Sequence, residues 1–354
     1  MSKHLDLFKL LKLSRTGTDR GVAGDLLILH PHGLHHPSHI SDMSVLEPKG
    51  SNSDTIDWVR DFREHLDKSQ PNGLSEAVVA IKTLLQLIKN SEAGTIAGLQ
   101  DEIKEGTKVL TEGISSIVSV SSGCELFVRF ITLSSLLGEE KDFQEIKRLL
   151  VERGNLYIQR VANSRQKIAQ VANPFIRDGT TVLVHSLSRV VFRLLFEASA
   201  SGKRLKIFIT TCAVDETGGI MQRWLEEAKI PSKLVLDSAV GFLMEKVDVV
   251  VVGAEGVAES GGIINKIGTY QIAVMAKTLN KPFYVVTESF KFVRVFPLKQ
   301  DDLPNEEKYC CVDSSTDSHP TIDYTPPHYI SLLFTDLGVL TPSAVSDELL
   351  KLYK

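Results

Sequence analysis

Apolar residues recur every three or four positions through most of the chain between residues 54 and 177. This spacing places them on one face of a helix, so it predicts a run of amphipathic helices. Helices are expected over residues 74–88, 95–110 and, as one or two long segments, 143–171. The run Ser121 to Gly123 predicts a break between two helical segments. The outer faces of the long helices are rich in Lys and Arg, which is more typical of a solvated surface than of a binding stripe.

After residue 177 the pattern changes to short apolar runs that alternate with helical segments, and Asp178-Gly179 marks the change. The expected strands are 181–185, 205–211, 233–236, 247–252 and 282–286, and the expected helices are 188–200, 221–228, 239–245, a segment from 269 and one after Pro342. Alternation of this kind is the signature of a doubly wound parallel sheet. The sequence therefore predicts an α/β protein: an N-terminal helical domain followed by a Rossmann-like doubly wound parallel-sheet domain.

The stretch from Val249 to Val274, with its flanking apolar residues, carries the strongest candidate chemistry. Its four consecutive valines predict a strand covered on both faces, the following glycines predict a tight loop, and Thr269 is expected to cap the next helix. Glu255, Asn265 and Lys266 fall in this loop, at the carboxyl end of a buried strand, where open α/β sheets bind ligands. A lysine before a helix amino terminus suits a phosphate. The alternative is an ordinary glycine-rich connection.

Three strand ends are expected to meet at one crevice of the sheet. The polar residues there are His185, Ser186, Ser188, Arg189, Glu255, Asn265, Lys266, Glu288 and Lys291. Arg189, Lys266 and Lys291 would concentrate positive charge in the crevice, and the helix after Ser188 would add backbone donors, as a phosphorylated small molecule requires. The alternative is a structural network in which these cations pair with Glu255 and Glu288.

Composition narrows the class of protein without naming a partner. With 354 residues and 43% hydrophobic content, the chain is long enough for two domains with sizeable cores. A net charge of −4 gives no overall attraction to nucleic acid or anionic membranes. There is no P-loop and no G-x-G-x-x-G motif. No apolar run reaches the roughly eighteen residues of a transmembrane helix, and no signal peptide is expected.

The four cysteines show neither C-x-x-C pairs nor zinc spacing, which fits a reducing compartment. Cys212 lies just past a strand end and invites a role as a nucleophile. A buried cysteine is more often a small core residue, so we expect Cys212 to be structural.

The two irregular parts of the chain are residues 1–52 and 295–329. The first predicts a low-order extension, dispensable for folding and assembly, that precedes a helical domain over 53–177 and an α/β domain over 178–354. Its histidines invite a metal site, but a loop without acidic or thiol partners favours a leader that binds no metal. They are His30, His32, His35, His36 and His39. The second segment is polar and predicts a surface loop.

Three motifs toward the carboxyl end carry a resemblance to a known family. They read GAEGVAESGGIINKIGTYQIAVMAK, KPFYVVTESFKFVRVFPL and LLFTDLGVLTPSAVSDELLKLY. The chain from about Ser53 to its end resembles the superfamily that unites the alpha, beta and delta subunits of eukaryotic translation initiation factor 2B with methylthioribose-1-phosphate and ribose-1,5-bisphosphate isomerases. Within it, the alpha-subunit branch is the one that the chain resembles. The resemblance does not cover the first fifty residues.

The resemblance also bears on the site. The isomerases carry an acid/base pair of a cysteine and an aspartate, and this chain has Ser186 and Glu255 at those places. A serine lacks the accessible ionisation of a thiol, and glutamate moves the charge by one methylene. The resemblance therefore implies no catalytic residue and no metal. The ligand-binding residues that it implies are Ser188, Arg189, Glu255, Asn265, Lys266 and Lys291. We expect a pocket for a sugar phosphate or nucleotide monophosphate, without turnover and without a required cofactor.

As to function, the resemblance implies a regulatory subunit of the guanine nucleotide exchange complex that acts on initiation factor 2 in the integrated stress response. The expected partners are a second copy of the chain, the beta, gamma, delta and epsilon subunits, and initiation factor 2 with a phosphorylated alpha subunit, in the cytosol, without nucleic acid or membrane. The apolar runs 329–334 and 337–340 suit either a dimer interface or core strands. The alternative function is an aldose-ketose isomerase acting on a phosphorylated pentose.

Overall fold

The structure is a computed structural model of the chain. It describes residues 73–111, 117–132, 142–212, 217–303, 309–311 and 318–352. All of these belong to one compact unit, Ser51–Lys354. The amino-terminal extension and its five histidines lie outside the described residues. Within the described ranges, no helix combines the length and the apolar character needed to cross a bilayer.

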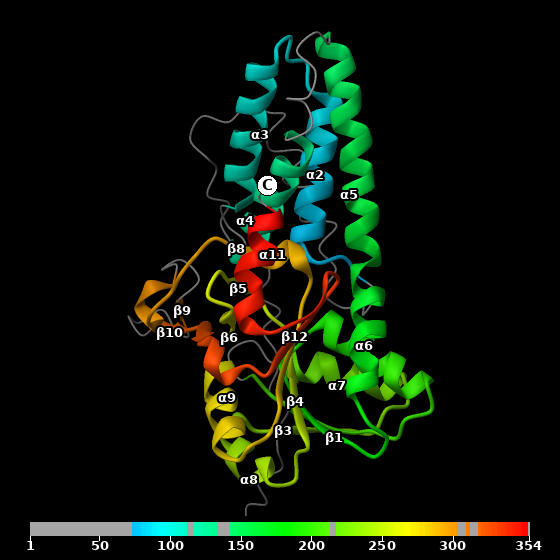
Figure 1. The fold of residues 1–354 in the computed structure, drawn as a ribbon, viewed down its shortest axis with the longest axis vertical. Helices are drawn as coiled ribbons and strands as arrows, with labels where there is room; N and C mark the ends of the chain where they lie inside the picture. The colour runs from blue at the N-terminus through cyan, green and yellow to red at the C-terminus, as the bar shows by residue number, and fades with distance from the viewer. Residues whose placement is uncertain are drawn as a thin grey trace, which may run out of the picture. The chain divides into compact units, whose positions relative to one another are not determined.

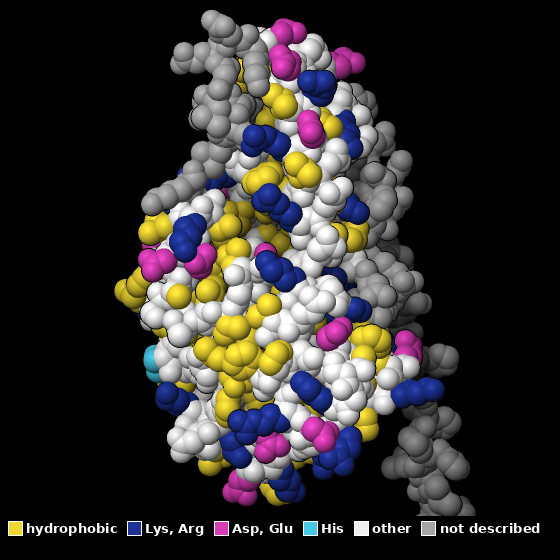
Figure 2. Space-filling model, turned by 45° about the vertical axis from the view of Figure 1, so that its right-hand side comes forward, with side chains coloured by type: hydrophobic (Ala, Val, Ile, Leu, Met, Phe, Trp, Pro, Cys, Tyr) yellow, Lys and Arg dark blue, Asp and Glu magenta, His cyan; other side chains and the backbone are white. Residues whose placement is uncertain are grey.

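Among the described residues, the helical region consists of α2 (Glu76–Asn90), α3 (Ile96–Thr111), α4 (Ile117–Thr132) and α5 (Phe143–Ala172) (Figure 1). Their apolar faces share a buried core that includes Ile81, Leu84, Phe127 and Leu150. The predicted helical periodicity is therefore confirmed, and the long segment proves to be the single 30-residue helix α5. On the face drawn in Figure 2, Lys and Arg side chains are interspersed with Asp and Glu side chains.

The predicted break at Ser121 to Gly123 is wrong, because α4 runs through it without interruption. The Ser122 hydroxyl oxygen lies 2.8 Å from the carbonyl oxygens of both Phe290 and Phe292. A Cβ atom added at Gly123 would lie 3.2 Å from the Cβ atom of Ala77. The small residues therefore serve close packing of α4 against neighbouring segments, a role that sequence spacing does not distinguish from a turn.

The second half of the chain forms a seven-stranded sheet in the order β13-β12-β7-β4-β1-β2-β3. The strands are β1 (Thr181–His185), β2 (Lys206–Thr210), β3 (Ser232–Val235), β4 (Val249–Val252), β7 (Phe283–Val286), β12 (Leu332–Thr335) and β13 (Gly338–Leu340). All neighbouring pairs are parallel except β12 and β13. The predicted fold class, a helical region followed by a doubly wound parallel sheet, is confirmed.

Helices cover both faces of this sheet (Figure 1). Alternate residues of each strand point to opposite faces, so Val182 and Val184 of β1 join one core while Leu183 joins the other. The first core holds α6 (Arg189–Ala200), α7 (Thr217–Glu227) and the end of α5; the second holds α8 (Val240–Met244), α9 (Thr269–Thr278) and α11 (Val345–Leu352). This two-sided burial explains why the strands consist of continuous apolar runs.

A second, four-stranded sheet in the order β11-β6-β5-β8 corrects two predictions. The predicted loop after β4 contains β5 (Gly256–Ala258) and β6 (Ile263–Lys266), and the predicted surface loop contains the buried strand β11 (Ile322–Thr325). The same segment includes the pair β9 (Tyr309–Cys311) and β10 (Ser318–Pro320), while β8 is Phe292–Val293. Strands this short have no readable alternation, which is why the pattern resembled loops.

Candidate ligand pocket

A cavity of about 140 Å³ lies at the carboxyl ends of β1 and β4. The strand order reverses between these two strands, and ligands of open α/β sheets bind at such switch points. A space of about 10–15 Å³ on this measure holds one water, so the cavity has room for on the order of ten waters. The polar lining residues are Ser75, Glu76, Ser119, Arg165, His185, Ser186, Ser188, Arg189, Thr217, Glu255, Asn265, Lys266, Glu288 and Lys291.

The first wall of the pocket is the amino terminus of α6. Ser188 is the N-cap residue of this helix, and its Oγ accepts a hydrogen bond from the backbone nitrogen of Val191 at 3.4 Å. Gly253, just after β4, approaches so closely that an added Cβ atom would lie 2.5 Å from Ser188 Oγ. Arg189 follows, with its guanidinium 5.9 Å from the ring centre of Trp224. Burial and the charge of Arg165 lower the pKa of Arg189, yet a guanidinium remains charged in proteins.

The second wall is a buried charge cluster that joins the helical region to the sheet. Glu288, which follows β7, lies 3.1 Å from Arg165 Nε and 3.6 Å from Lys291 Nζ. Lys291 Nζ also donates to the carbonyl oxygen of Ala254 at 2.8 Å. Burial acts to raise the pKa of Glu288, but the charges of Lys291 and Arg165 outweigh it, so the pKa lies below its usual range. Lys291 thus takes part in the structural network that the sequence left as an alternative, while still lining the cavity.

The third wall is the end of β6, which carries Asn265 and Lys266. Asn265 Nδ2 donates to Thr269 Oγ1 at 2.9 Å, and that hydroxyl donates to the carbonyl oxygen of Lys266 at 2.6 Å. Thr269 was predicted to cap α9, but it is the first residue of this helix. The N-cap position belongs to Gly268, whose φ of +101° is in the left-handed region that favours glycine.

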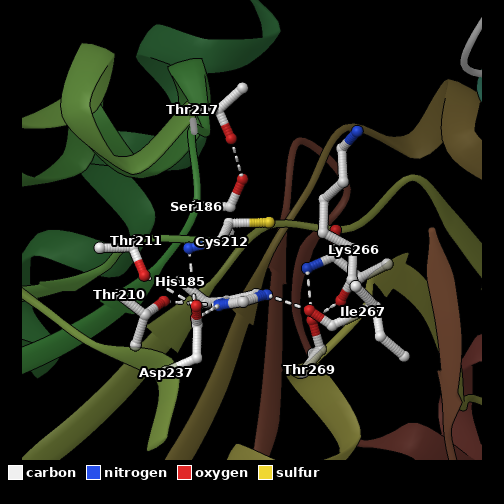
Figure 3. A network of polar contacts seen from close by, with 12 residues as sticks. His185, Ser186, Thr210, Thr211, Cys212, Thr217, Asp237, Lys266, Ile267 and Thr269 are labelled. Atoms are coloured by element: carbon white, nitrogen blue, oxygen red, sulfur yellow. Dashed lines mark hydrogen bonds and ion pairs between the residues drawn. The ribbon is translucent and has the colours of Figure 1, made fainter. Parts of the chain in front are cut away.

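His185 and Ser186 complete the pocket at the end of β1 (Figure 3). His185 Nε2 lies 2.9 Å from the carbonyl oxygen of Ile267, and Nδ1 lies 2.6 Å from Thr210 Oγ1. Because a carbonyl oxygen only accepts, Nε2 carries a proton. Ser186 has a φ of +57°, and its hydroxyl lies 2.6 Å from Thr217 Oγ1. The neighbouring imidazole is thus engaged away from Ser186, so the geometry provides no His-assisted activation of the serine.

The structure brings all the predicted site residues to one cavity: Ser186, Ser188, Arg189, Glu255, Asn265, Lys266 and Lys291 each line it. Sequence reasoning missed the contribution of the helical region, which comes from Ser75, Glu76, Ser119 and Arg165. These residues lie far from the strand ends in the sequence, and no motif surrounds them. Cys212 is 2% exposed, as expected of a structural cysteine.

The arrangement suits binding better than proton transfer. Four cations, Arg165, Arg189, Lys266 and Lys291, line the cavity together with three carboxylates, so its lining is cationic by one charge. The α6 amino terminus adds backbone donors and the positive end of a helix dipole. These features suit the binding of a small anion. Fold and pocket together define a Rossmann-like protein with a cationic crevice at the switch point of its sheet.

Comparison with known proteins identifies the family. The model of the initiation factor 2 subunit family matches residues 73–342, and the chain belongs to this family. A protein of Dictyostelium discoideum named translation initiation factor eIF2B subunit alpha is 45% identical, over 86% of this chain and 99% of that protein. Its namesake from Caenorhabditis elegans is 38% identical, over 83% and 98%.

More distant relatives include an enzyme. A ribose 1,5-bisphosphate isomerase of Archaeoglobus fulgidus is 28% identical, over 72% of this chain and 82% of the enzyme. Among solved structures, a chain of the tetrameric eIF2B-beta2-delta2 complex of C. thermophilum superimposes with a TM-score of 0.69. It is 17% identical and covers 84% of this chain and 94% of that chain, which supports the fold alone.

Proposed function

We propose that this chain is the alpha-type regulatory subunit of a cytosolic translation initiation factor 2B exchange complex, and that its pocket binds a sugar phosphate or nucleotide monophosphate without converting it. The observation that carries the pocket is the convergence of Arg189, Lys266 and Lys291 on one cavity at the sheet's switch point. The likeness over nearly the full length of two alpha subunits supports the assignment to the complex.

The absence of turnover follows from the two altered positions. Ser186 is a poor acid/base group at neutral pH, because a serine hydroxyl loses its proton only at a much higher pH than a thiol does. The neighbouring side chain of Thr217 offers only a second neutral hydroxyl. Glu255 keeps the carboxylate that the resemblance implies at its place but sets it on a longer side chain. A pocket with the binding groups and without a matched proton-transfer pair is suited to sensing a metabolite.

The binding claim is tested by calorimetry with ribose 5-phosphate and with AMP. We expect saturable binding to the wild-type chain and a loss of about tenfold or more in Lys266→Ala, because a charged contact to phosphate is removed. Lys277→Ala is the matched control, since Lys277 is exposed in the same segment and does not line the cavity. If neither ligand binds, or if the wild type and Lys266→Ala bind with equal affinity, the pocket is removed from the proposal.

The alternative, a pentose-phosphate isomerase, has the support of the enzyme relative. Incubation with ribose 1,5-bisphosphate or methylthioribose 1-phosphate, followed by product analysis, separates the two functions. We expect no conversion. Saturable conversion that disappears in Glu255→Ala would favour the enzyme and refute a purely regulatory role.

We further propose that the chain bridges the complex as a homodimer through the edge of its main sheet. Of the two apolar runs, 329–334 contains the buried core residues Leu333 and Phe334, whereas Leu337 and Val339, next to and within edge strand β13, are 40% and 38% exposed. Light scattering should report a dimer that Val339→Lys weakens. Leu236→Lys is the matched control: Leu236 is also exposed but lies outside β13, so this variant should leave the dimer intact.

Assembly and sensing need a cellular test. In the proposal, the helical region presents the surface that reads phosphorylated initiation factor 2, and the other subunits hold the exchange activity. Tagged chain recovered from native lysate should carry the four other exchange-factor subunits. Recovery of the dimer alone would refute the assignment to the complex, whatever the outcome of the calorimetry.

A further inference from the structure

The backbone that presents Asn265 and Lys266 to the pocket is fastened by a strand outside the pocket. β11 pairs with β6 antiparallel, and Asp323 lies directly opposite Asn265 in the register. One residue beyond the paired segment, the backbone nitrogen of Ile267 donates to the carbonyl oxygen of Thr321 at 2.9 Å. The short connection from β6 to α9 therefore follows β11.

Asp323 continues this attachment with its side chain. Its Oδ2 accepts hydrogen bonds from the backbone nitrogens of Gly268 at 2.8 Å and Tyr270 at 3.0 Å. These nitrogens belong to the amino terminus of α9, where a carboxylate is favoured by the orphan donors and the helix dipole. The N-cap residue itself makes no side-chain hydrogen bond, so the cap of α9 comes from a residue 55 positions later in the chain.

The carboxylate is held there against a desolvation cost. Asp323 is 5% exposed, and its Oδ1 has no hydrogen-bond partner among the described residues. Burial raises the pKa of Asp323 to about 7, although the backbone amides of Tyr270, Gly268 and Thr269 act to lower it. An apolar side chain would fill this position at less cost. A carboxyl group at this buried position is therefore explained by the amides that its Oδ2 binds.

The opposite side of the same connection is held by His185. Its Nε2 donates to the carbonyl oxygen of Ile267, so the peptide groups on either side of Ile267 are attached to β1 and to β11 (Figure 3 shows the His185 side). A Cβ atom at Gly268 would lie 3.1 Å from His185 Cε1, which leaves little room for the connection to move toward β1. Position and orientation of Lys266 are thus set from both sides.

We propose that Asp323 is a positioning residue of the pocket: by holding the amides of Gly268 and Tyr270, it fixes where the Asn265 amide and the Lys266 ammonium meet a phosphate ester. Asp323 does not line the cavity and acts only through the β6–α9 connection. This inference rests on the proposed function in one respect, namely that the pocket binds a phosphorylated ligand.

The test compares Asp323→Ala, Asp323→Asn and Asp323→Glu in the full chain, with Tyr324→Phe as the matched control. Tyr324 is the next residue of β11, and its hydroxyl lies 2.9 Å from Ser260 Oγ, away from the connection. Calorimetry should show that Asp323→Ala weakens the affinity for ribose 5-phosphate, by a factor of up to about ten. Asp323→Asn should restore most of it, because the amide oxygen still accepts from both nitrogens, whereas Asp323→Glu should not. Tyr324→Phe should bind as the wild type does.

Hydrogen exchange of residues 266–272 in the absence of ligand gives the second readout. Exchange should be faster in Asp323→Ala than in Asp323→Asn, and unchanged in Tyr324→Phe. Equal affinity in wild type and Asp323→Ala overturns the inference, as does an Asp323→Asn variant that loses as much affinity as Asp323→Ala. Should Asp323→Ala not fold, the comparison of Asp323→Asn with Asp323→Glu tests the inference, and equal affinity of these two variants overturns it. If the wild type binds no ribose 5-phosphate, the pocket's proposed ligand fails, and unaltered exchange in Asp323→Ala would then refute the positioning role by itself.

Discussion

The buried cluster of Arg165, Glu288 and Lys291 allows a quantitative prediction, because its three members differ in how many partners each loses. Removing one member of a buried ion pair costs about 3–5 kcal/mol, mainly because the remaining charge is left uncompensated. In Arg165→Met, Glu288 keeps Lys291 at 3.6 Å, so we expect the free energy of unfolding to fall by about 3 kcal/mol, the lower end of this range. In Glu288→Leu, two cations lose their carboxylate at once, so we expect the upper end, about 5 kcal/mol.

The double variant Arg165→Met/Glu288→Leu should recover much of this loss. Replacing a buried pair by apolar residues of similar volume is often neutral, and Lys291 retains its hydrogen bond to the carbonyl oxygen of Ala254. We therefore expect the double variant to be at least about 2 kcal/mol more stable than Glu288→Leu. A double-mutant cycle by urea unfolding, followed by far-UV circular dichroism, measures the coupling.

The pH dependence gives a second check on the same cluster. The pKa of Glu288 lies below its ordinary value in the folded chain, so its contribution to stability is present above about pH 4.5 and is lost as the pH falls through the lowered pKa. Glu288→Leu should therefore flatten the acid limb of the stability curve. Additive losses in the cycle, or an unchanged acid limb, would show that the three charges do not act as one cluster.

Three further predictions concern single positions. Gly253→Ala should reduce ribose 5-phosphate affinity in calorimetry about tenfold or more, because the new methyl group would lie 2.5 Å from Ser188 Oγ at the pocket wall; unchanged affinity would contradict the close approach. Ser122→Ala should lower the free energy of unfolding in urea by about 1–3 kcal/mol, since the hydroxyl proton that two buried carbonyl oxygens share is lost; Ser121→Ala, on an exposed position, is the control. For Asp323 the pKa of about 7 exceeds the ordinary 3.8, so the folded chain keeps a proton that the unfolded chain has released, and the free energy of unfolding should fall by about 3 kcal/mol as the pH rises from 4 to 7. Asp323→Asn should remove this slope in unfolding experiments across that range, and a slope that persists would exclude Asp323 as its source.

The sequence predicted the main sheet and the pocket well, for identifiable physical reasons. Runs such as the four valines of β4 are buried on both faces, and this leaves a continuous apolar signal. Ser188, Arg189 and Lys291 line the pocket, and their positions after strand ends were enough to predict that they lie together. Lys266 was found for the same reason, although its loop proved to contain strand β6.

The rest was hidden because it depends on contacts between distant segments. Ser122 and Gly123 read as a helix break, yet they permit close packing against Phe290 and α2. Glu76 and Arg165 line the pocket only because α2 and α5 meet the sheet at that point. The cap of α9 comes from Asp323, which no local capping pattern would reveal.

The order of the attachment points along the chain has a consequence for biosynthesis. Every side chain that lines the cavity has been made by residue 291, but β11, which holds the connection after β6, begins at Ile322. A nascent chain therefore contains every pocket-lining residue before it contains the strand that pairs with β6. On this basis the pocket would reach its final geometry only after β11 has been made, and termination before β11 would yield a product that has the pocket-lining residues yet lacks their arrangement.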